Sequence, residues 1–161
     1  MDLERIRFGV RDTVEDLARS LAVRAQQKGL DVIFASYHLL NVDAQFVFLG
    51  GGEKRYADSL LELRRALPEK VGVETNFSDR MEHRLMAGAD MFLMPSVYEP
   101  CGLTQMRAQR YGTLPVGRRV GGIADTVEDG VTGFLFDKYD ASAFQEAAFR
   151  AMGAMQDRAR W

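Results

Sequence analysis

Residues 91–111 read MFLMPSVYEPCGLTQMRAQRY, and this stretch decides the fold. Its first four residues are continuously apolar and are stopped by Pro95, which is typical of a strand buried on both faces of a sheet. After a loop, residues 103–111 have a helical pattern, and a second short apolar run follows at 114–117. The order strand, helix, strand predicts a βαβ unit with parallel strands.

The same alternation extends along the chain from residue 41 onward. Further strands are predicted at 45–49, 70–75 and 133–136, and helices at 53–67, 79–87, 123–128 and 141–155. This pattern predicts an α/β fold, namely a single Rossmann-like, three-layer domain with a mainly parallel sheet. Ligands of such sheets bind at the carboxyl ends of the strands, so the loops at 50–53, 95–102 and 118–122 form the candidate site.

Residues 1–40 give a less clear pattern. Residues 6–10 are expected to form a strand that pairs in the sheet. A helix is expected at 13–27, where Val14, Leu17, Leu21 and Ala25 recur every three or four positions. Gly29 would end that helix, and residues 30–40 would start another.

Composition narrows the functional class. The chain has 161 residues, 47% hydrophobic and 27% charged, as expected for one globular domain with a real core. A net charge of −2, from 21 Lys and Arg against 23 Asp and Glu, argues against nucleic-acid or acidic-lipid partners. The single cysteine and the lack of a secretory leader favour a cytoplasmic protein, and no apolar run is long enough to span a membrane.

The loop before residue 103 combines two features of a ligand site. Backbone amides in the first turn of a helix, here at 102–104, can hold phosphate oxygens. Phosphate would repel the carboxylate of Glu99, which is better suited to accept hydrogen bonds from sugar hydroxyls. Together the two features predict a sugar nucleotide as ligand. The alternative is that Glu99 is an ordinary charged loop residue beside a well-capped helix.

Five motifs, in this order, resemble the carboxyl-terminal domain of bacterial glycogen synthases and plant starch synthases. They are MPS at 94–96, EPCGLTQ at 99–105, YGTLPV at 111–116, GGIADTV at 121–127 and DGVTGFLF at 129–136. Those enzymes are retaining glycosyltransferases with two Rossmann-like domains that face each other across a cleft. The resemblance implies transfer of glucose from ADP-glucose, or less often UDP-glucose, to an α-1,4-glucan, with no metal and no other cofactor.

The resemblance also implies roles for individual residues. Lys28, in QQKG, would neutralise the donor phosphates and Glu99 would bind the donor glucose hydroxyls, so these two are the expected catalytic residues. The expected donor-binding residues are Phe77, Cys101, Gly102, Leu103, Thr104, Gly121 and Gly122. In this set Phe77 would lie against the nucleobase, although a buried loop anchor is an equally good interpretation. A homodimer is an open possibility.

One departure from the family concerns catalysis. In the family an arginine at the end of a strand precedes the QKG motif by a fixed interval and assists the leaving diphosphate. Here Val23 occupies that position and Arg24 lies one residue too close to the lysine. A slip of one residue turns a side chain to the opposite face on a strand, or by about 100° on a helix, which argues against this role for Arg24.

The other departure concerns residues 1–27, which do not resemble the synthases. Residues 8–30 resemble instead the segment of sensor histidine kinases that leads from the dimerisation helices into the ATP-binding domain. We therefore expect a chimera, with a non-family segment at 1–27 packed on a donor-binding domain at 28–161. A divergent amino terminus is the alternative.

Without the family's other domain, the chain is expected to be inactive alone. The second functional interpretation is a non-catalytic nucleotide-binding or structural α/β domain that arose by recombination.

Overall fold

The structure is a computed structural model that describes residues 19–24, 29–50 and 53–156. Within these residues the chain forms a six-stranded parallel sheet with the order β3-β2-β1-β4-β5-β6. The strands are β1 (Arg19–Arg24), β2 (Ala44–Leu49), β3 (Val71–Glu74), β4 (Met91–Met94), β5 (Leu114–Arg118) and β6 (Phe134–Phe136). This is the order of a Rossmann-like domain, with its switch point between β1 and β4.

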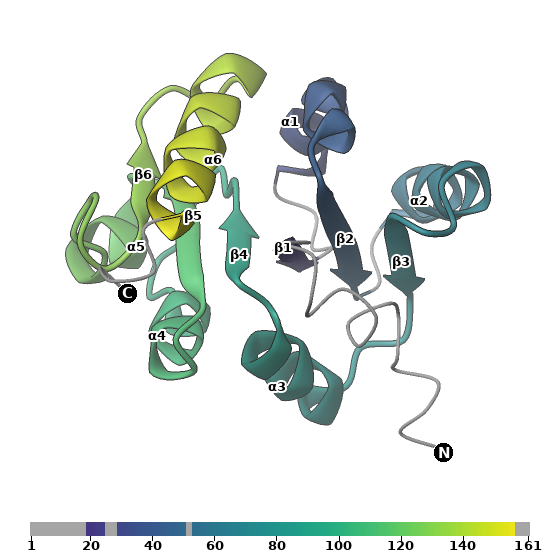
Figure 1. The fold of residues 1–161 in the computed structure, drawn as a ribbon. Helices are drawn as coiled ribbons and strands as arrows, with labels where there is room; N and C mark the ends of the chain where they lie inside the picture. Colours follow the sequence, from purple (N-terminus) through teal and green to yellow (C-terminus); the bar gives the residue numbers. More distant parts are fainter. Residues whose placement is uncertain (1–18, 25–28, 51–52, 157–161) are drawn as a thin grey trace.

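Helices cover both faces of the sheet and give the three layers (Figure 1). They are α1 (Leu30–Ala35), α2 (Lys54–Ala66), α3 (Asp79–Gly88), α4 (Leu103–Arg110), α5 (Gly121–Thr126) and α6 (Ala141–Met155), with a 3-10 helix, η2 (Tyr37–Asn41), after α1. α1, α2 and α6 lie on one face, and α3 and α4 on the other. None of the helices in the described ranges is long and apolar enough to cross a membrane. The predicted α/β, mainly parallel fold is confirmed.

The β4 strand shows why its sequence does not alternate between apolar and polar residues. Met91 and Leu93 pack into the core beneath α1, α2 and α6, whereas Phe92 and Met94 pack into the core beneath α3 and α4. All four side chains are buried. A strand covered by helices on both faces needs apolar residues at every position.

The amino-terminal prediction is wrong. Residues 19–24 form β1, a strand in the middle of the sheet, and not part of a helix at 13–27. β1 pairs along its whole length with β2, and residues 21–23 also pair with β4. These non-local pairings override a local helical spacing, which cannot distinguish a short buried strand from a helix. The strand predicted at 6–10 lies outside the described residues.

Gly29 and Ser36 explain a second difference in this region. Gly29 does not end a helix but precedes α1, with a φ of 102° that favours glycine. The helix predicted at 30–40 is interrupted at Ser36, whose hydroxyl donates to the Val32 carbonyl at 2.7 Å. Such a bond competes with helix continuation, so α1 stops and η2 follows.

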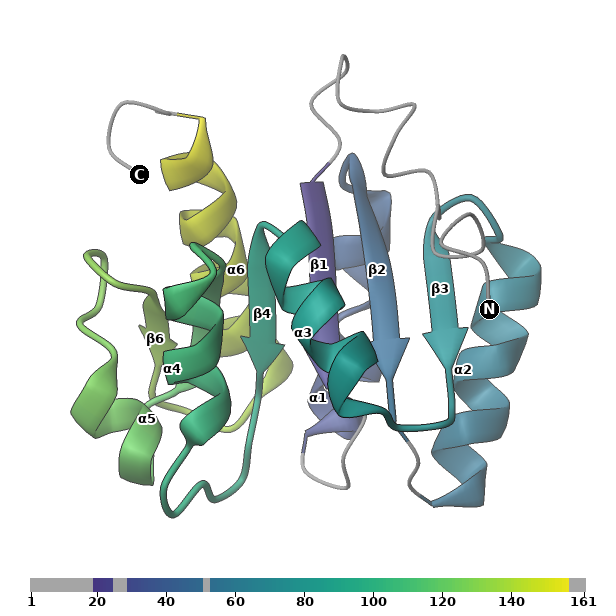
Figure 2. The ribbon, with the colours of Figure 1, turned by 90° about the horizontal axis from the view of Figure 1, so that it is seen from below.

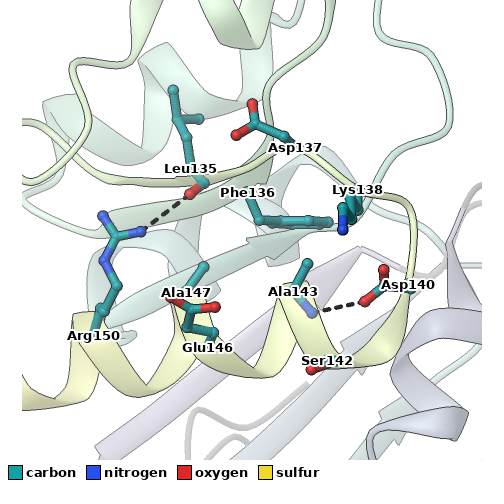
Figure 3. Close-up of a pocket in the computed structure, with 10 residues that line it drawn as sticks. All are labelled: Leu135, Phe136, Asp137, Lys138, Asp140, Ser142, Ala143, Glu146, Ala147 and Arg150. Carbon is teal, nitrogen blue, oxygen red and sulfur yellow. Dashed lines mark hydrogen bonds between the residues drawn. The ribbon is translucent and has the colours of Figure 1, made fainter.

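The outer edge of β6 is closed by two side chains. The Leu135 N–H donates to Asp129 Oδ1 at 2.8 Å. Arg150 donates to the Leu135 carbonyl at 3.3 Å, as Figure 3 shows. Arg150 and Asp129 also form an ion pair at 2.6 Å. The backbone groups that a further strand would use are therefore already bonded.

Candidate functional site

The carboxyl ends of the parallel strands lie along one edge of the sheet, and the loops that follow β4 and β5 meet there (Figure 2). The loop after β4, residues 95–102, is called the Glu99 loop below. Close to it is the turn at Gly121 and Gly122, which opens α5. The predicted site thus lies at the switch point, where ligands of this fold bind.

Backbone contacts hold the Glu99 loop against this turn. The Gly122 N–H donates to the Glu99 carbonyl at 2.9 Å. A Cβ at Gly121 would overlap the same carbonyl, and a Cβ at Gly122 would overlap the Cys101 carbonyl. Both positions therefore require glycine for close approach, and Gly121 also has a φ of 46°.

The first turn of α4 completes this arrangement. Gly102 precedes α4 with a φ of 58° and has no side chain with which to cap the helix. The next two residues differ in exposure, since Leu103 is 57% exposed and Thr104 only 8%. Amides of a first helical turn have no acceptor within the helix and carry partial positive charge, so this end of α4 can bind an anion.

Glu99 lies in the loop that leads directly into this helix end. The residue is half-buried, and the Ser96 hydroxyl donates to Glu99 Oε2 at 3.4 Å. The contact comes from the same loop, so it restrains the carboxylate without neutralising it. The loop thus carries a charged acceptor a few residues before a helix end that attracts anions.

Gln105 is a site residue that the sequence analysis did not single out. Its side chain is fully buried and donates to the Gly122 carbonyl at 3.0 Å and to Thr126 Oγ1 at 2.8 Å. It therefore ties α4 to α5 beneath the Glu99 loop. Its place in the EPCGLTQ motif was the available signal, but only the fold brings its partners within reach.

The structure unites most, but not all, of the predicted residues. Glu99 and Cys101 contact the turn at Gly121 and Gly122 through the backbone, and Gly102 packs against the Gln105 side chain. The thiol of Cys101 is free and the residue is exposed.

Phe77 lies in a different loop, between β3 and α3, and is 45% exposed. It is therefore not a buried anchor.

Two predictions concern this part of the chain: that Lys28 neutralises the donor phosphates, and that Arg24 is one residue out of position for catalysis. Lys28 itself lies outside the described residues. The residue after it, Gly29, is so close to Pro95 that a Cβ would overlap the Pro95 carbonyl. The chain directly after Lys28 thus contacts the Glu99 loop. The one-residue offset between Val23 and Arg24 falls on a strand, where Val23 is opposite Phe48 and Leu93.

A second group of contacts at the same edge was not predicted. Arg118, the last residue of β5, donates to the Val97 carbonyl at 2.8 Å, and its guanidinium lies 5.3 Å from the centre of the Tyr139 ring. The Tyr139 hydroxyl donates to Asp31 Oδ1 at 2.6 Å, in the first turn of α1. Loops after β4 and β6 are thereby joined to α1.

The Tyr139 hydroxyl gives this group a pH dependence. Burial, the Asp31 hydrogen bond and the charge of Asp31 raise the pKa of Tyr139 above 10.0, with a small contribution from Tyr56, while Arg118 opposes the shift. Because the pKa of Tyr139 is raised in the folded state, the stabilisation that its protonated hydroxyl gives the fold is complete below about pH 10 and declines as the pH rises further.

We expect the difference in free energy of unfolding between wild type and Tyr139→Phe to shrink from pH 8 to pH 11, measured by urea denaturation. An unchanged difference would contradict this.

A surface hollow of about 360 Å³ lies between the end of β6 and α6 (Figure 3). Of its lining side chains, Arg150 is engaged with β6, and Asp140 caps α6 by accepting from the Ala143 N–H at 2.8 Å. None of the predicted site residues lines it. Within the described ranges, no group of three or more His, Cys, Asp or Glu could hold a metal ion.

The sheet order defines a Rossmann-like domain with its candidate site at the carboxyl ends of the strands. The family model for "Glycosyl transferases group 1" matches residues 6–161, and the chain belongs to this family. The match begins well before residue 28, where the sequence analysis placed the start of the donor-binding domain. That boundary and the chimeric origin of residues 1–27 stay predictions.

Similar proteins include bacterial glycogen synthases. That of Anaeromyxobacter sp. (strain K) is 47% identical over 143 residues, covering 85% of this chain and 30% of the relative. That of Pseudomonas fluorescens (strain Pf0-1) is 43% identical over 145 residues, covering 89% of this chain and 30% of the relative. The predicted resemblance is confirmed, and the chain spans less than a third of the length of these relatives.

Solved structures are similar as well. The catalytic domain of starch synthase IV from Arabidopsis thaliana, bound to ADP and acarbose, superposes with a TM-score of 0.81 at 29% identity over 90% of this chain and 33% of that one. Anabaena HepE in complex with UDP-glucose gives a TM-score of 0.74 at 22% identity over 98% of this chain and 43% of that one. The second likeness concerns the fold alone.

Proposed function

We propose that this chain is the donor-binding half of a glucosyltransferase that moves glucose from ADP-glucose, or UDP-glucose, to an α-1,4-glucan. One observation carries the proposal: the Gly122 N–H holds the Glu99 carbonyl at 2.9 Å, which fixes the backbone of a carboxylate residue in the loop that leads into α4. The similarity to glycogen synthases and to a starch synthase bound to ADP supports the substrate class.

The two halves of the site suit the two halves of the donor. The diphosphate binds at the first turn of α4, where Gly102, Leu103 and Thr104 present backbone amides and the helix dipole favours negative charge. Glu99 accepts hydrogen bonds from the glucose hydroxyls, because a carboxylate would repel the diphosphate itself. Cys101 and the turn at Gly121 and Gly122 line the space between them.

Two further residues extend the proposed site. Lys28 neutralises the donor phosphates, which agrees with the contact that Gly29 makes with the Glu99 loop. Phe77 stacks against the nucleobase, for which its 45% exposed side chain is accessible. We further propose that the protein works in the cytoplasm; a homodimer stays a prediction.

The chemistry proposed for these groups is electrostatic. Lys28 and the amides of α4 stabilise the departing diphosphate, and the acceptor hydroxyl attacks on the face that the diphosphate leaves. No protein nucleophile or metal is required in this scheme. The acceptor must be held against the donor carbon, which is the task of the other domain in the parent enzymes.

A direct titration tests the proposal. The purified chain is mixed with ADP, UDP, ADP-glucose and UDP-glucose, and binding is followed by calorimetry or by NMR shifts. Binding of a glucose conjugate with a contribution from the sugar supports the proposal. Binding of the nucleotide alone, with no effect of the sugar, would favour the non-catalytic nucleotide-binding interpretation, and no binding at all a structural domain.

The substitution Glu99→Gln isolates the carboxylate. It keeps the size of the side chain but removes a charged acceptor, so binding of ADP-glucose should weaken by about tenfold while that of ADP changes little. Dissociation constants from the same titration give the result. Equal losses for the two ligands would contradict a role in binding the sugar hydroxyls.

A further inference from the structure

The Glu99 loop is held on both sides of its carboxylate residue. On the carboxyl-terminal side, the Gly122 N–H bonds the Glu99 carbonyl at 2.9 Å. On the amino-terminal side, Arg118 donates to the Val97 carbonyl at 2.8 Å. Val97 is 50% exposed and Tyr98 59% exposed, so this part of the loop lies at the surface. The Arg118 bond is one restraint on the approach of the chain to Glu99.

Arg118 is itself fixed by its surroundings. Its Nε donates to the Asp137 carbonyl at 3.3 Å, and its guanidinium lies over the Tyr139 ring at 5.3 Å. Tyr139 in turn donates to Asp31 at 2.6 Å. The guanidinium at the end of β5 thus bonds both the loop after β4 and the loop after β6. Tyr139 connects this group to α1.

We propose that Arg118 is a positioning residue for the donor sugar: by holding the Val97 carbonyl, it sets where the Glu99 carboxylate meets the glucose hydroxyls. This inference rests on the proposed function, since it assigns the sugar to Glu99. Arg118 acts through the backbone of the loop. Tyr139 supports it from the opposite side by fixing the guanidinium.

The neighbouring arginine offers a matched control. Arg119 is also at the end of β5, but it pairs with Asp137 Oδ1 at 2.9 Å and with Asp129 Oδ2 at 3.8 Å. No bond to the Glu99 loop is recorded for it within the described residues. A change of Arg119 removes the same charge from the same edge of the sheet without releasing Val97.

The experiment compares dissociation constants of ADP and ADP-glucose for wild type, Arg118→Met, Arg118→Lys, Tyr139→Phe and Arg119→Met. In Arg118→Met the side chain keeps an unbranched stem but is shorter and loses every donor, so ADP-glucose should bind about fivefold more weakly and ADP less than about twofold. Arg118→Lys keeps one donor and should restore part of the loss. Tyr139→Phe should give a smaller loss of the same kind, and Arg119→Met no difference between the ligands.

The outcomes separate the inference from the function on which it rests. If wild type binds neither ligand, the proposed function fails and the role of Arg118 with it. If wild type binds ADP-glucose but Arg118→Met loses both ligands equally, or neither, the donor site stands and only the positioning role is overturned. If Arg118→Met does not fold, Arg118→Lys and Tyr139→Phe take its place, with their folding checked by thermal unfolding. The ratio of the dissociation constants for ADP-glucose and ADP then decides the positioning role.

Discussion

The purified chain is expected to bind ADP-glucose with a dissociation constant near the millimolar range, about −4 kcal/mol, and to add no labelled glucose to glycogen or maltooligosaccharide. The diphosphate and sugar contacts proposed for α4 and Glu99 lie within this domain, so some binding should persist. Transfer requires more, because the acceptor hydroxyl must be held against the donor carbon in a cleft that excludes water. Such positioning is worth about 7 to 11 kcal/mol.

The absence of a suitably placed arginine should lower the rate further. At Val23, where the resemblance to the synthases predicts an arginine that assists the leaving group, this chain has no charge. One lost electrostatic contact of this kind costs about 3 kcal/mol, or more than a hundredfold in rate. Incorporation of labelled glucose is the measurement. Extension of a glucan by the chain alone would show that a second domain is dispensable and would overturn the proposal.

Gly122→Ala is expected to destabilise the domain by about 3 kcal/mol and to abolish binding of ADP-glucose. The new Cβ would overlap the Cys101 carbonyl, which is backbone and cannot rotate away. The Glu99 loop must move as a whole, and the bonds from Gly122 to Glu99 and from Gln105 to Gly122 are disturbed together. Urea denaturation and the ligand titration measure the two effects.

Gly153→Ala is the control for that substitution. Gly153 lies in α6, and an added Cβ there meets no heavy atom within 4 Å. Alanine is the better helix former, so this variant should be more stable by about 1 kcal/mol and should bind as wild type does. A Gly122→Ala protein as stable as wild type would mean that the loop and the turn are not closely packed.

Local sequence was sufficient for the elements whose signals are complete within a short stretch. β4 is where MFLM and Pro95 predict it, and α6 is where the sequence predicts a helix at 141–155. β1 was missed because its identity depends on β2 and β4, which are distant in sequence. A helical spacing over 13–27 carries no information about these partners.

The same distinction applies to the site. Glu99 and Gly102 were found because a carboxylate and a glycine before a helix form a local pattern. The link between Tyr139 and Asp31 joins residues 108 positions apart, and that between Arg118 and Val97 joins residues 21 apart. No local sequence pattern marks these residues as partners. They meet only because the ends of the strands converge at one edge of the sheet.

The closed edge of β6 limits how this domain can associate. An incoming strand would have to displace Asp129 from the Leu135 N–H and Arg150 from the Leu135 carbonyl, and would break the ion pair between them. Two copies therefore cannot pair edge to edge through β6 to form a continuous sheet. The other edge strand of the sheet is β3, so any pairing of two copies through a shared sheet must use that side of the domain.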